Sequence, residues 1–235
     1  MEDGRAKMNK LEILYEDNHI IVVKKEPNIP SQADKTEDLD MFTIIKQYLK
    51  EKYDKPGNVY LGLVHRLDRP VGGVMIFAKT SKAASRLSNQ VREKVFKKKY
   101  LAVVDGKFEN KKGVLEDYLY KDERNNMSKV VNKDKKNAKL AKLDYEVLAY
   151  NEVKKLSLVK VNLHTGRHHQ IRVQLANSGH SIFGDQKYGS RGKGKQIALW
   201  AYELTIQHPV TKEELTFKCL PENNGTWCII RDVNI

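Results

Sequence analysis

Cysteine is scarce in this sequence: the 235 residues contain two, Cys219 and Cys228. Their spacing fits neither a zinc knuckle nor a Cys-x-x-Cys redox motif, so we expect reduced, buried thiols rather than a metal site or a disulfide. The chain also lacks an uncharged apolar run long enough to span a bilayer, and its first residues lack the apolar core of a signal peptide. These absences favour a soluble, cytoplasmic protein.

Acidic residues are outnumbered by basic ones. The 43 Lys and Arg residues against 30 Asp and Glu give a formal net charge of +13, which predicts attraction to a polyanion, with nucleic acid as the first candidate. A chain of this length can bury a substantial core as one domain or as two closely packed lobes. A fixed-period repeat, a dinucleotide-binding fingerprint and a phosphate-binding glycine loop are all missing.

The hydrophobic pattern predicts antiparallel-looking strand pairs with helices between them, which is an α+β class. The expected strands are 11–15, 19–24, 74–78, 96–106, 143–150, 154–163, 197–207 and 215–220. The expected helices are 39–53 and 80–94, with Tyr53 and Val91 on their inner faces, and 168–177, which Gly179 would end. Residues 121–142 hold eight basic residues against three acidic ones, so we expect an exposed, partly mobile loop.

One carboxylate stands among cations just before a strongly apolar run. Asp68 is flanked by Arg66 and Arg69, with His65 three residues upstream, so its ionised form is favoured. Pro70 and the following glycines place Asp68 on a loop, and the apolar run 74–78 predicts a buried strand that holds this loop. Such a loop is typical of catalytic groups, although a solvated charged turn fits the composition at least as well.

Two further stretches combine basic and aromatic residues. In 165–172, a helix would bring Arg172 next to His169 on one surface. The histidines suggest a metal, but no carboxylate stands at ligand spacing and the arginines would repel a divalent cation, so we predict no metal site; an ordinary basic helix is the alternative. The lysines of 97–99, just before Tyr100, suit phosphate contact with base stacking, or simply a solvated strand entrance.

Three motifs occur in the order typical of the RluA-type RNA pseudouridine synthases, and the sequence resembles that family over roughly residues 11–220. The first motif is His65-Arg66-Leu67-Asp68-Arg69, followed by Gly73 and Phe77-Ala78-Lys79. The second is Lys99-Tyr100 with Ala102, Val104 and Gly106. The third is Thr165-Gly166-Arg167 and His169-Gln170-Ile171-Arg172, then Gly179, Gly184-Asp185 and Tyr188-Gly189. Val71-Gly72 replaces the usual Thr-Ser, and Gln174 replaces a frequent His.

The resemblance implies the pseudouridine synthase fold: a mixed, largely antiparallel sheet bent into two lobes, with flanking helices, a central cleft and no metal or organic cofactor. The implied reaction cuts the bond between uracil and ribose, turns the base and rejoins it through carbon five. Asp68 would be the nucleophile or base, Arg172 its partner, and Tyr100 the ring packed on uracil. Arg66 would assist base extrusion. Other residues expected to bind substrate are His65, Arg69, Arg167, His169, Gln170, Lys97, Lys98 and Lys99.

For the whole chain, we expect residues 1–10 to form a flexible extension and 11–235 a single catalytic domain without a separate N-terminal RNA-binding domain. It would act as a monomer on structured RNA, ribosomal or transfer. A non-catalytic RNA-binding or RNA-folding module that keeps the fold explains the charge equally well, but it does not explain why Asp68, Tyr100 and Arg172 occur together. A metal-dependent nuclease would need a carboxylate cluster beside the His-rich stretch, and the sequence has none there.

Overall fold

The computed structural model describes residues 11–34, 36–189, 196–231, 233 and 235. The chain divides into two compact units, each built from two segments. The first unit comprises Met1–Phe96 and Ala201–Cys219, and the second comprises Lys97–Trp200 and Leu220–Ile235. The expected extension, residues 1–10, lies outside the described residues.

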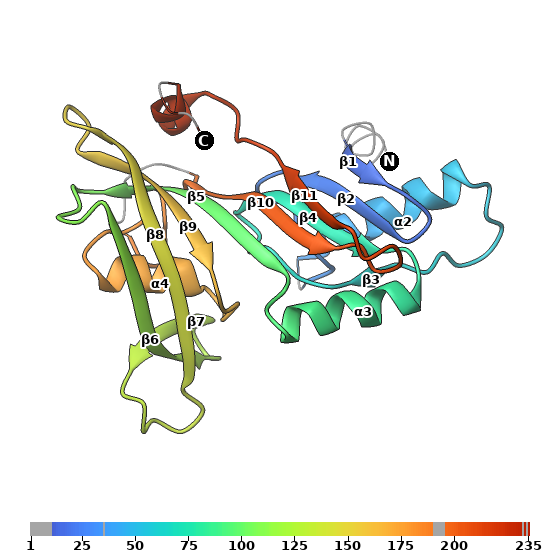
Figure 1. Ribbon diagram of the computed structural model, residues 1–235, viewed down its shortest axis with the longest axis horizontal. Helices are drawn as coiled ribbons and strands as arrows, with labels where there is room; N and C mark the ends of the chain where they lie inside the picture. The colour runs from blue at the N-terminus through green and yellow to red at the C-terminus, as the bar shows by residue number, and fades with distance from the viewer. Residues whose placement is uncertain (1–10, 35, 190–195, 232, 234) are drawn as a thin grey trace. The chain divides into compact units, whose positions relative to one another are not determined.

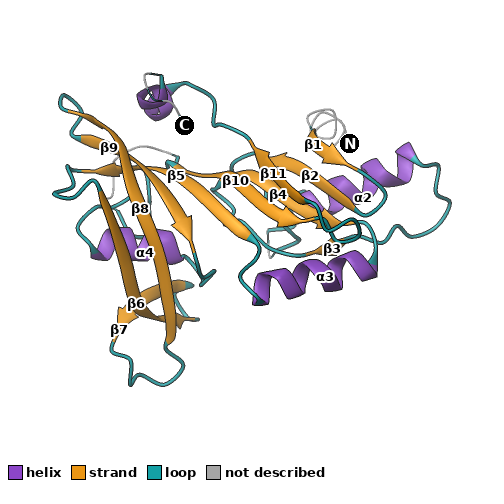
Figure 2. Ribbon diagram, viewed as in Figure 1, coloured by secondary structure: helices purple, strands orange, loops and turns teal. Residues whose placement is uncertain are grey.

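The first unit is a β-sheet with helices (Figures 1 and 2). Its strands follow the order β1-β2-β4-β10-β11, with β3 beside β4. The pairs β1–β2, β2–β4, β3–β4 and β10–β11 are antiparallel. The elements are β1 Glu12–Glu16, β2 Ile20–Lys25, α2 Met41–Lys52, β3 Gly62–Leu63, β4 Gly72–Ala78, α3 Ser81–Arg92, β10 Leu199–Gln207 and β11 Glu214–Lys218. Strand β10 begins with Leu199 and Trp200, which end the first segment of the second unit, and its other residues belong to the first unit.

Strand β4 is buried along its whole length, as its apolar run predicts, because β2 and β10 flank it on both edges. Its second residue has to be glycine for two reasons. Gly73 has a φ of +125°, a conformation that side chains rarely tolerate. A Cβ at this position would also lie 2.2 Å from the carbonyl oxygen of Ala201 in β10. The loop that carries Asp68 therefore leads into a fixed strand.

The predicted helices form, but their inner faces differ from expectation. Thr80 caps α3, its hydroxyl accepting from the Ala83 amide at 3.1 Å. Val91 is 36% exposed, whereas Gln90 is buried. The Gln90 side chain donates to the Gln207 carbonyl at 2.7 Å and accepts from the Gln207 amide at 3.0 Å. A pattern of apolar residues cannot reveal a buried polar side chain that satisfies a strand's backbone.

Tyr53 is likewise 42% exposed rather than buried with α2, because its hydroxyl donates to Glu16 at 2.8 Å. The Glu16 carboxylate is only 7% exposed and is also bonded by Lys52 at 2.7 Å and Lys79 at 2.6 Å. Burial alone would raise the pKa of Glu16, but the hydrogen bonds from the lysines and tyrosines outweigh it and lower this pKa to about 2.

We predict a specific acid sensitivity from Glu16. Between its unfolded pKa of 4.5 and its folded pKa of about 2, the unfolded chain binds a proton that the folded chain does not. Its stabilisation is therefore complete above pH 4.5 and is lost as the pH falls towards 2, by up to about 3 kcal/mol. Denaturant unfolding at pH 7, 4 and 3 gives the free energy of unfolding, which should depend less on pH in Glu16→Gln than in the parent. The same change at the exposed Glu12 is the control, and equal slopes for Glu16→Gln and the parent contradict the prediction.

The second unit is an antiparallel sheet in the order β5-β9-β8-β6-β7. Helix α4 contacts β6 and β7, and a small core is formed by Leu119 of β6, Ala141 of β8 and Val173 of α4. The elements are β5 Lys97–Asp105, β6 Lys112–Asp122, β7 Met127–Val131, β8 Lys139–Asn151, β9 Leu156–Leu163, α4 Gln170–Asn177 and the 3-10 helix η1 Gly225–Ile230.

The expected loop at 121–142 is wrong, because half of this segment is sheet: it contains the end of β6, all of β7 and the start of β8. Its inward positions are taken by Ser128 and Ala141, which are 2% and 0% exposed, while Lys129 and Lys139 point outward. Small inward residues conceal the alternation that predicts a strand, and the outward lysines dominate the composition.

Cys219 and Cys228 are not joined in a disulfide, as expected, but each is half-buried rather than buried. Among the described residues, no helix combines the length and apolar character needed to cross a membrane.

Candidate active site

Asp68 lies half-buried on the loop between β3 and β4, as predicted. The backbone on both sides of it is held in place. The buried Ser31 hydroxyl donates to the Leu67 carbonyl at 2.8 Å and accepts from the Leu67 amide at 3.1 Å. After Asp68, the Val71 amide closes a turn onto the Asp68 carbonyl at 2.9 Å. The carboxylate is thus carried by a loop with little freedom to move.

A completely buried lysine at the end of β2 supports the same loop. The Lys25 ammonium donates to carbonyl oxygens of Glu26 at 3.1 Å, Ile29 at 2.6 Å and Arg69 at 2.9 Å. Burial lowers the pKa of Lys25 to about 7, although the negative charge of Asp68 acts in the opposite direction. Sequence reasoning missed this residue, because nothing in the strand distinguishes it from Lys24, which pairs with Glu12.

The three residues predicted to accompany Asp68 have different surroundings. Arg66 is exposed, and its side chain has no hydrogen bond or ion pair with any described residue. The Arg69 guanidinium instead bonds Thr36 at 2.8 Å and pairs with Asp38. His65 accepts a hydrogen bond from the Ile76 amide of β4 at 3.2 Å. Arg66 is therefore the group available to an incoming ligand, while Arg69 and His65 hold the loop.

In the second unit, Arg172 of α4 forms a buried ion pair with Asp185. Its Nε and Nη2 lie 2.8 and 2.7 Å from the two carboxylate oxygens. The Asp185 side chain is 0% exposed. Burial would raise the pKa of Asp185, but the Arg172 guanidinium and the backbone amides of Lys187 and Tyr188 lower it. In the sequence, Asp185 stands out only as part of the third motif, and its ion pair with Arg172 was not predicted.

The turn before α4 is stabilised by residues predicted to bind substrate. Gln170 accepts from the Thr165 hydroxyl at 2.8 Å and the Arg167 amide at 3.0 Å. His169 adopts a left-handed conformation, with φ of 52°, and its Nδ1 lies 2.9 Å from the Tyr188 hydroxyl. Both side chains are thus used to shape the turn. The Arg167 side chain is exposed.

Tyr100 sits on β5 opposite Val161 of β9 and is 7% exposed. Lys98 lies two residues earlier on the same face of the strand, and burial lowers its pKa. A Cβ at Gly166 would lie 3.3 Å from the Lys98 ammonium, so Lys98 abuts the turn before α4. Of the three predicted lysines, only Lys97 is exposed.

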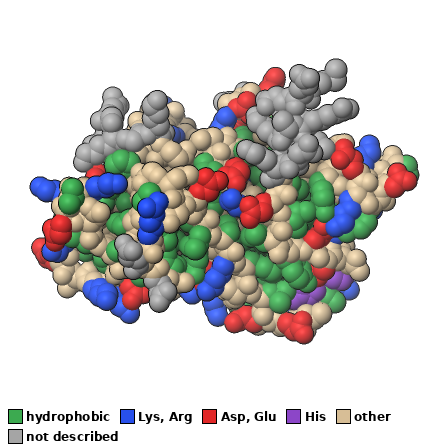
Figure 3. Space-filling model, turned by 90° about the horizontal axis from the view of Figure 1, so that it is seen from above, with side chains coloured by type: hydrophobic (Ala, Val, Ile, Leu, Met, Phe, Trp, Pro, Cys, Tyr) green, Lys and Arg blue, Asp and Glu red, His purple; other side chains and the backbone are tan. Residues whose placement is uncertain are grey.

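The excess positive charge does not form one patch on the face shown in Figure 3, where basic side chains are scattered among acidic ones. Many lysines are paired. Lys24, Lys107, Lys112 and Lys142 contact Glu12, Glu152, Glu146 and Glu116. Attraction to a polyanion must therefore depend on the cations that are not neutralised in this way.

Comparison with known proteins decides the family. Residues 19–177 match the family model for RNA pseudouridylate synthase. The chain belongs to this family of isomerases. Pseudouridine synthases of known sequence match most of the chain. A dual-specificity RNA pseudouridine synthase of Escherichia coli O157:H7 is 34% identical over 88% of the chain and 92% of its own length. A tRNA pseudouridine synthase of Haemophilus influenzae is 30% identical over 88% of the chain and 91% of its length.

An uncharacterised pseudouridine synthase of Bacillus subtilis is 34% identical over 87% of the chain, which spans 66% of that relative's length. Among solved structures, the human RNA pseudouridylate synthase domain containing 4 has a TM-score of 0.77 at 23% identity, covering 94% of both chains. This similarity shows the fold. The pseudouridine synthase family and fold implied by the three motifs are thus confirmed, while the roles of single residues stay predictions.

Proposed function

We propose that this protein isomerises specific uridines in ribosomal or transfer RNA to pseudouridine, with Asp68 as the nucleophile or base. The observation that carries the proposal is the rigid support of Asp68: Ser31 and Lys25 fix the loop on both sides of a carboxylate in a member of a synthase family. Holding a reacting group in place removes much of the entropic part of a barrier.

The reaction needs access to a uridine that stacking hides, so the nucleotide must leave its stack. We assign Arg66 to this step, because its side chain is exposed and has no partner among the described residues. A guanidinium can stack in the space that the base vacates and bond the flanking bases. Arg69 and His65 would serve catalysis indirectly, by holding the loop.

We assign Arg172 the role of stabilising the charge on Asp68 during the reaction. The bidentate pairing with Asp185 fixes the plane of the guanidinium, so Arg172 is preorganised for a second carboxylate. In this assignment Asp185 is a positioning residue and contacts no substrate. The isomerisation needs no redox partner or energy source, so we propose that the protein uses no cofactor. We also propose that it acts in the cytoplasm and as a monomer.

Tyr100 is proposed to pack on the target uracil and to assist proton removal at carbon five. Tyr100→Phe keeps the ring, so RNA affinity should change little, while the chemical step should slow by about a hundredfold. Single-turnover measurement of pseudouridine formation checks this. Tyr118→Phe on β6 is the matched control. A Tyr100→Phe variant that reacts at the parental rate would show that the hydroxyl has no chemical role.

The direct test of the proposed function is to incubate the protein with unmodified cellular RNA and map the new pseudouridines, with Asp68→Asn in parallel. We expect sites that appear only with the parent protein. RNA binding without any new pseudouridine would overturn the proposal and favour a non-catalytic RNA-binding module that has kept the fold.

A further inference from the structure

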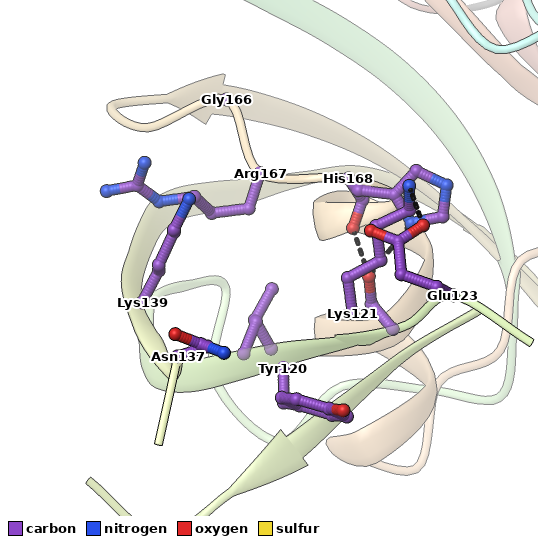
Figure 4. A pocket seen from close by; sticks show the side chains of 10 residues that line it. Tyr120, Lys121, Glu123, Asn137, Lys139, Gly166, Arg167 and His168 are labelled. Carbon is purple, nitrogen blue, oxygen red and sulfur yellow. Dashed lines mark hydrogen bonds and ion pairs between the residues drawn. The ribbon is translucent and has the colours of Figure 1, made fainter. Parts of the chain in front are cut away.

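The second unit contains a pocket of about 420 Å³ (Figure 4). It is formed by the end of β6, Ser128 of β7, the start of β8 and the turn that precedes α4. Neither Tyr100 nor Arg172 is among the described residues that line it. The lining consists of Leu119, Tyr120, Lys121, Glu123, Ser128, Asn137, Lys139, Gly166, Arg167 and His168.

The lining carries an unbalanced positive charge. Lys121, Lys139 and Arg167 stand against Glu123, a difference of three minus one, or +2. The Lys121 ammonium pairs with Glu123 at 2.6 Å, so these two cancel. Figure 4 draws Lys139 and Arg167 on the opposite side of the pocket. The excess positive charge of the lining therefore lies on the side of Lys139 and Arg167.

Neither of these two cations is neutralised. Among the described residues, Lys139 has no ion pair or hydrogen bond from its ammonium. Arg167 donates through Nε to the carbonyl of Leu140, the next residue after Lys139, at 2.9 Å. That bond holds the guanidinium close to Lys139 and leaves its two terminal nitrogens for another acceptor. Two cations held together attract an anion that can bridge them.

The rest of the pocket fits a ligand larger than a simple anion. Pockets of about 300–1,000 Å³ hold organic ligands, so this volume leaves room beyond a phosphate. Asn137 lines it, and its amide has no hydrogen-bond partner among the described residues. An amide both donates and accepts, as the edge of a nucleobase does.

We propose that this pocket binds one nucleotide of the RNA substrate other than the target uridine. Its phosphate would lie between Lys139 and Arg167, and its base would lie beside Asn137. The proposal rests on the proposed function for its choice of RNA as ligand. It adds a binding site apart from Asp68, Tyr100 and Arg172, to which the chemistry is assigned.

A chain of hydrogen bonds connects the pocket to Arg172 within the same unit. The amide of Ser128, in the pocket wall, donates to the Tyr188 hydroxyl at 2.6 Å. The Tyr188 amide donates to Asp185 at 3.2 Å, and Asp185 holds Arg172. A nucleotide in the pocket would therefore be fixed relative to Arg172, which helps to choose the uridine that reacts.

The test compares two double variants. Lys139→Gln/Arg167→Gln removes the unneutralised pair. The control, Lys111→Gln/Lys154→Gln, removes two exposed lysines near the opposite ends of β6 and β8. Affinity for a short single-stranded RNA of mixed sequence is measured at several salt concentrations. We expect the first variant to flatten the slope of log affinity against log salt by about 0.7, the contribution of the one phosphate that both cations contact, and the control to leave it unchanged.

Loss of the Arg167 bond to Leu140 could disturb the fold of the double variant. The single variants Lys139→Gln and Asn137→Ala keep this bond, so they test the pocket without that effect. On the RNA that the mapping identifies, both should raise KM while kcat at saturating RNA stays within about threefold. Competition with uridine 5′-monophosphate separates a subsite for RNA from a site for free nucleotides. Displacement of the RNA by the mononucleotide at equal concentration would overturn the proposal.

The outcomes separate this inference from the proposed function. Unchanged affinity and slope in the first double variant, with active parent protein, would refute the subsite alone. A parent without pseudouridine formation, but with RNA affinity that depends on Lys139 and Arg167, would refute the isomerase and support the subsite.

Discussion

Asp68→Asn is expected to abolish pseudouridine formation, with a loss of at least about 10⁴-fold, while RNA affinity stays within about twofold. Loss of a nucleophile in other enzymes has effects of this size. The amide has nearly the shape of the carboxylate but cannot act as nucleophile or base. The backbone bonds that Ser31 makes beside it do not involve the side chain, so the loop should stay folded. Pseudouridine mapping and RNA titration measure the two quantities.

Asp38→Asn is the matched control for this experiment. Asp38 is an exposed carboxylate that pairs with Arg69, one residue after Asp68, so its loss disturbs the same region without touching the proposed chemistry. We expect nearly parental turnover. Turnover by Asp68→Asn comparable with the parent, after deamidation back to Asp has been excluded by mass spectrometry, would overturn the assignment.

Arg172→Ala is expected to damage stability and activity together. It leaves the Asp185 carboxylate, which is 0% exposed, without its partner, and breaking a buried pair in this way costs about 3–5 kcal/mol. Activity should fall as well, because the proposed partner of Asp68 is lost. Denaturant unfolding gives the first effect, and single-turnover rates below the unfolding transition give the second.

Two companion variants separate the structural effect from the catalytic one. Arg172→Met/Asp185→Leu removes the stranded charge and should regain part of the stability while remaining inactive; the amides of Lys187 and Tyr188 lose their acceptor, which limits the gain. Arg172→Lys keeps a charge but not the fork that bonds both carboxylate oxygens, so it should be more stable than Arg172→Ala and still slow. An active Arg172→Met/Asp185→Leu variant would show that Arg172 has only a structural role.

Short-range patterns in the chain were enough to find the loop, its strand and the family. The apolar run of β4 needs no distant residue to be recognised, and it forms a fully buried strand. Thr80 caps α3 because its hydroxyl reaches an amide three residues away, and Gly179, with φ of 87°, follows α4 as expected. Each of these features depends on residues within a few positions of one another.

Features that depend on distant residues needed the folded chain. Ser31 and Leu67 are 36 residues apart, and Lys25 and Arg69 are 44 apart, yet these bonds fix the loop of Asp68. The strand β7 was concealed because a small polar residue, Ser128, fills its buried position. Nothing local predicts such pairings, since a buried polar group can be satisfied by any segment that folding brings within hydrogen-bond reach.

The pocket is the clearest case of this difference. Its lining comes from four segments of the second unit: the end of β6 and the residues after it, Ser128 of β7, the start of β8 with Asn137 before it, and the turn before α4. In the sequence, Lys139 is one of eight basic residues in a polar stretch. Only the packing of β8 against the turn before α4 places it beside Arg167 without a neutralising carboxylate. Charge composition alone predicts that a polyanion binds, whereas the pairing of individual charges in the folded chain decides where it binds.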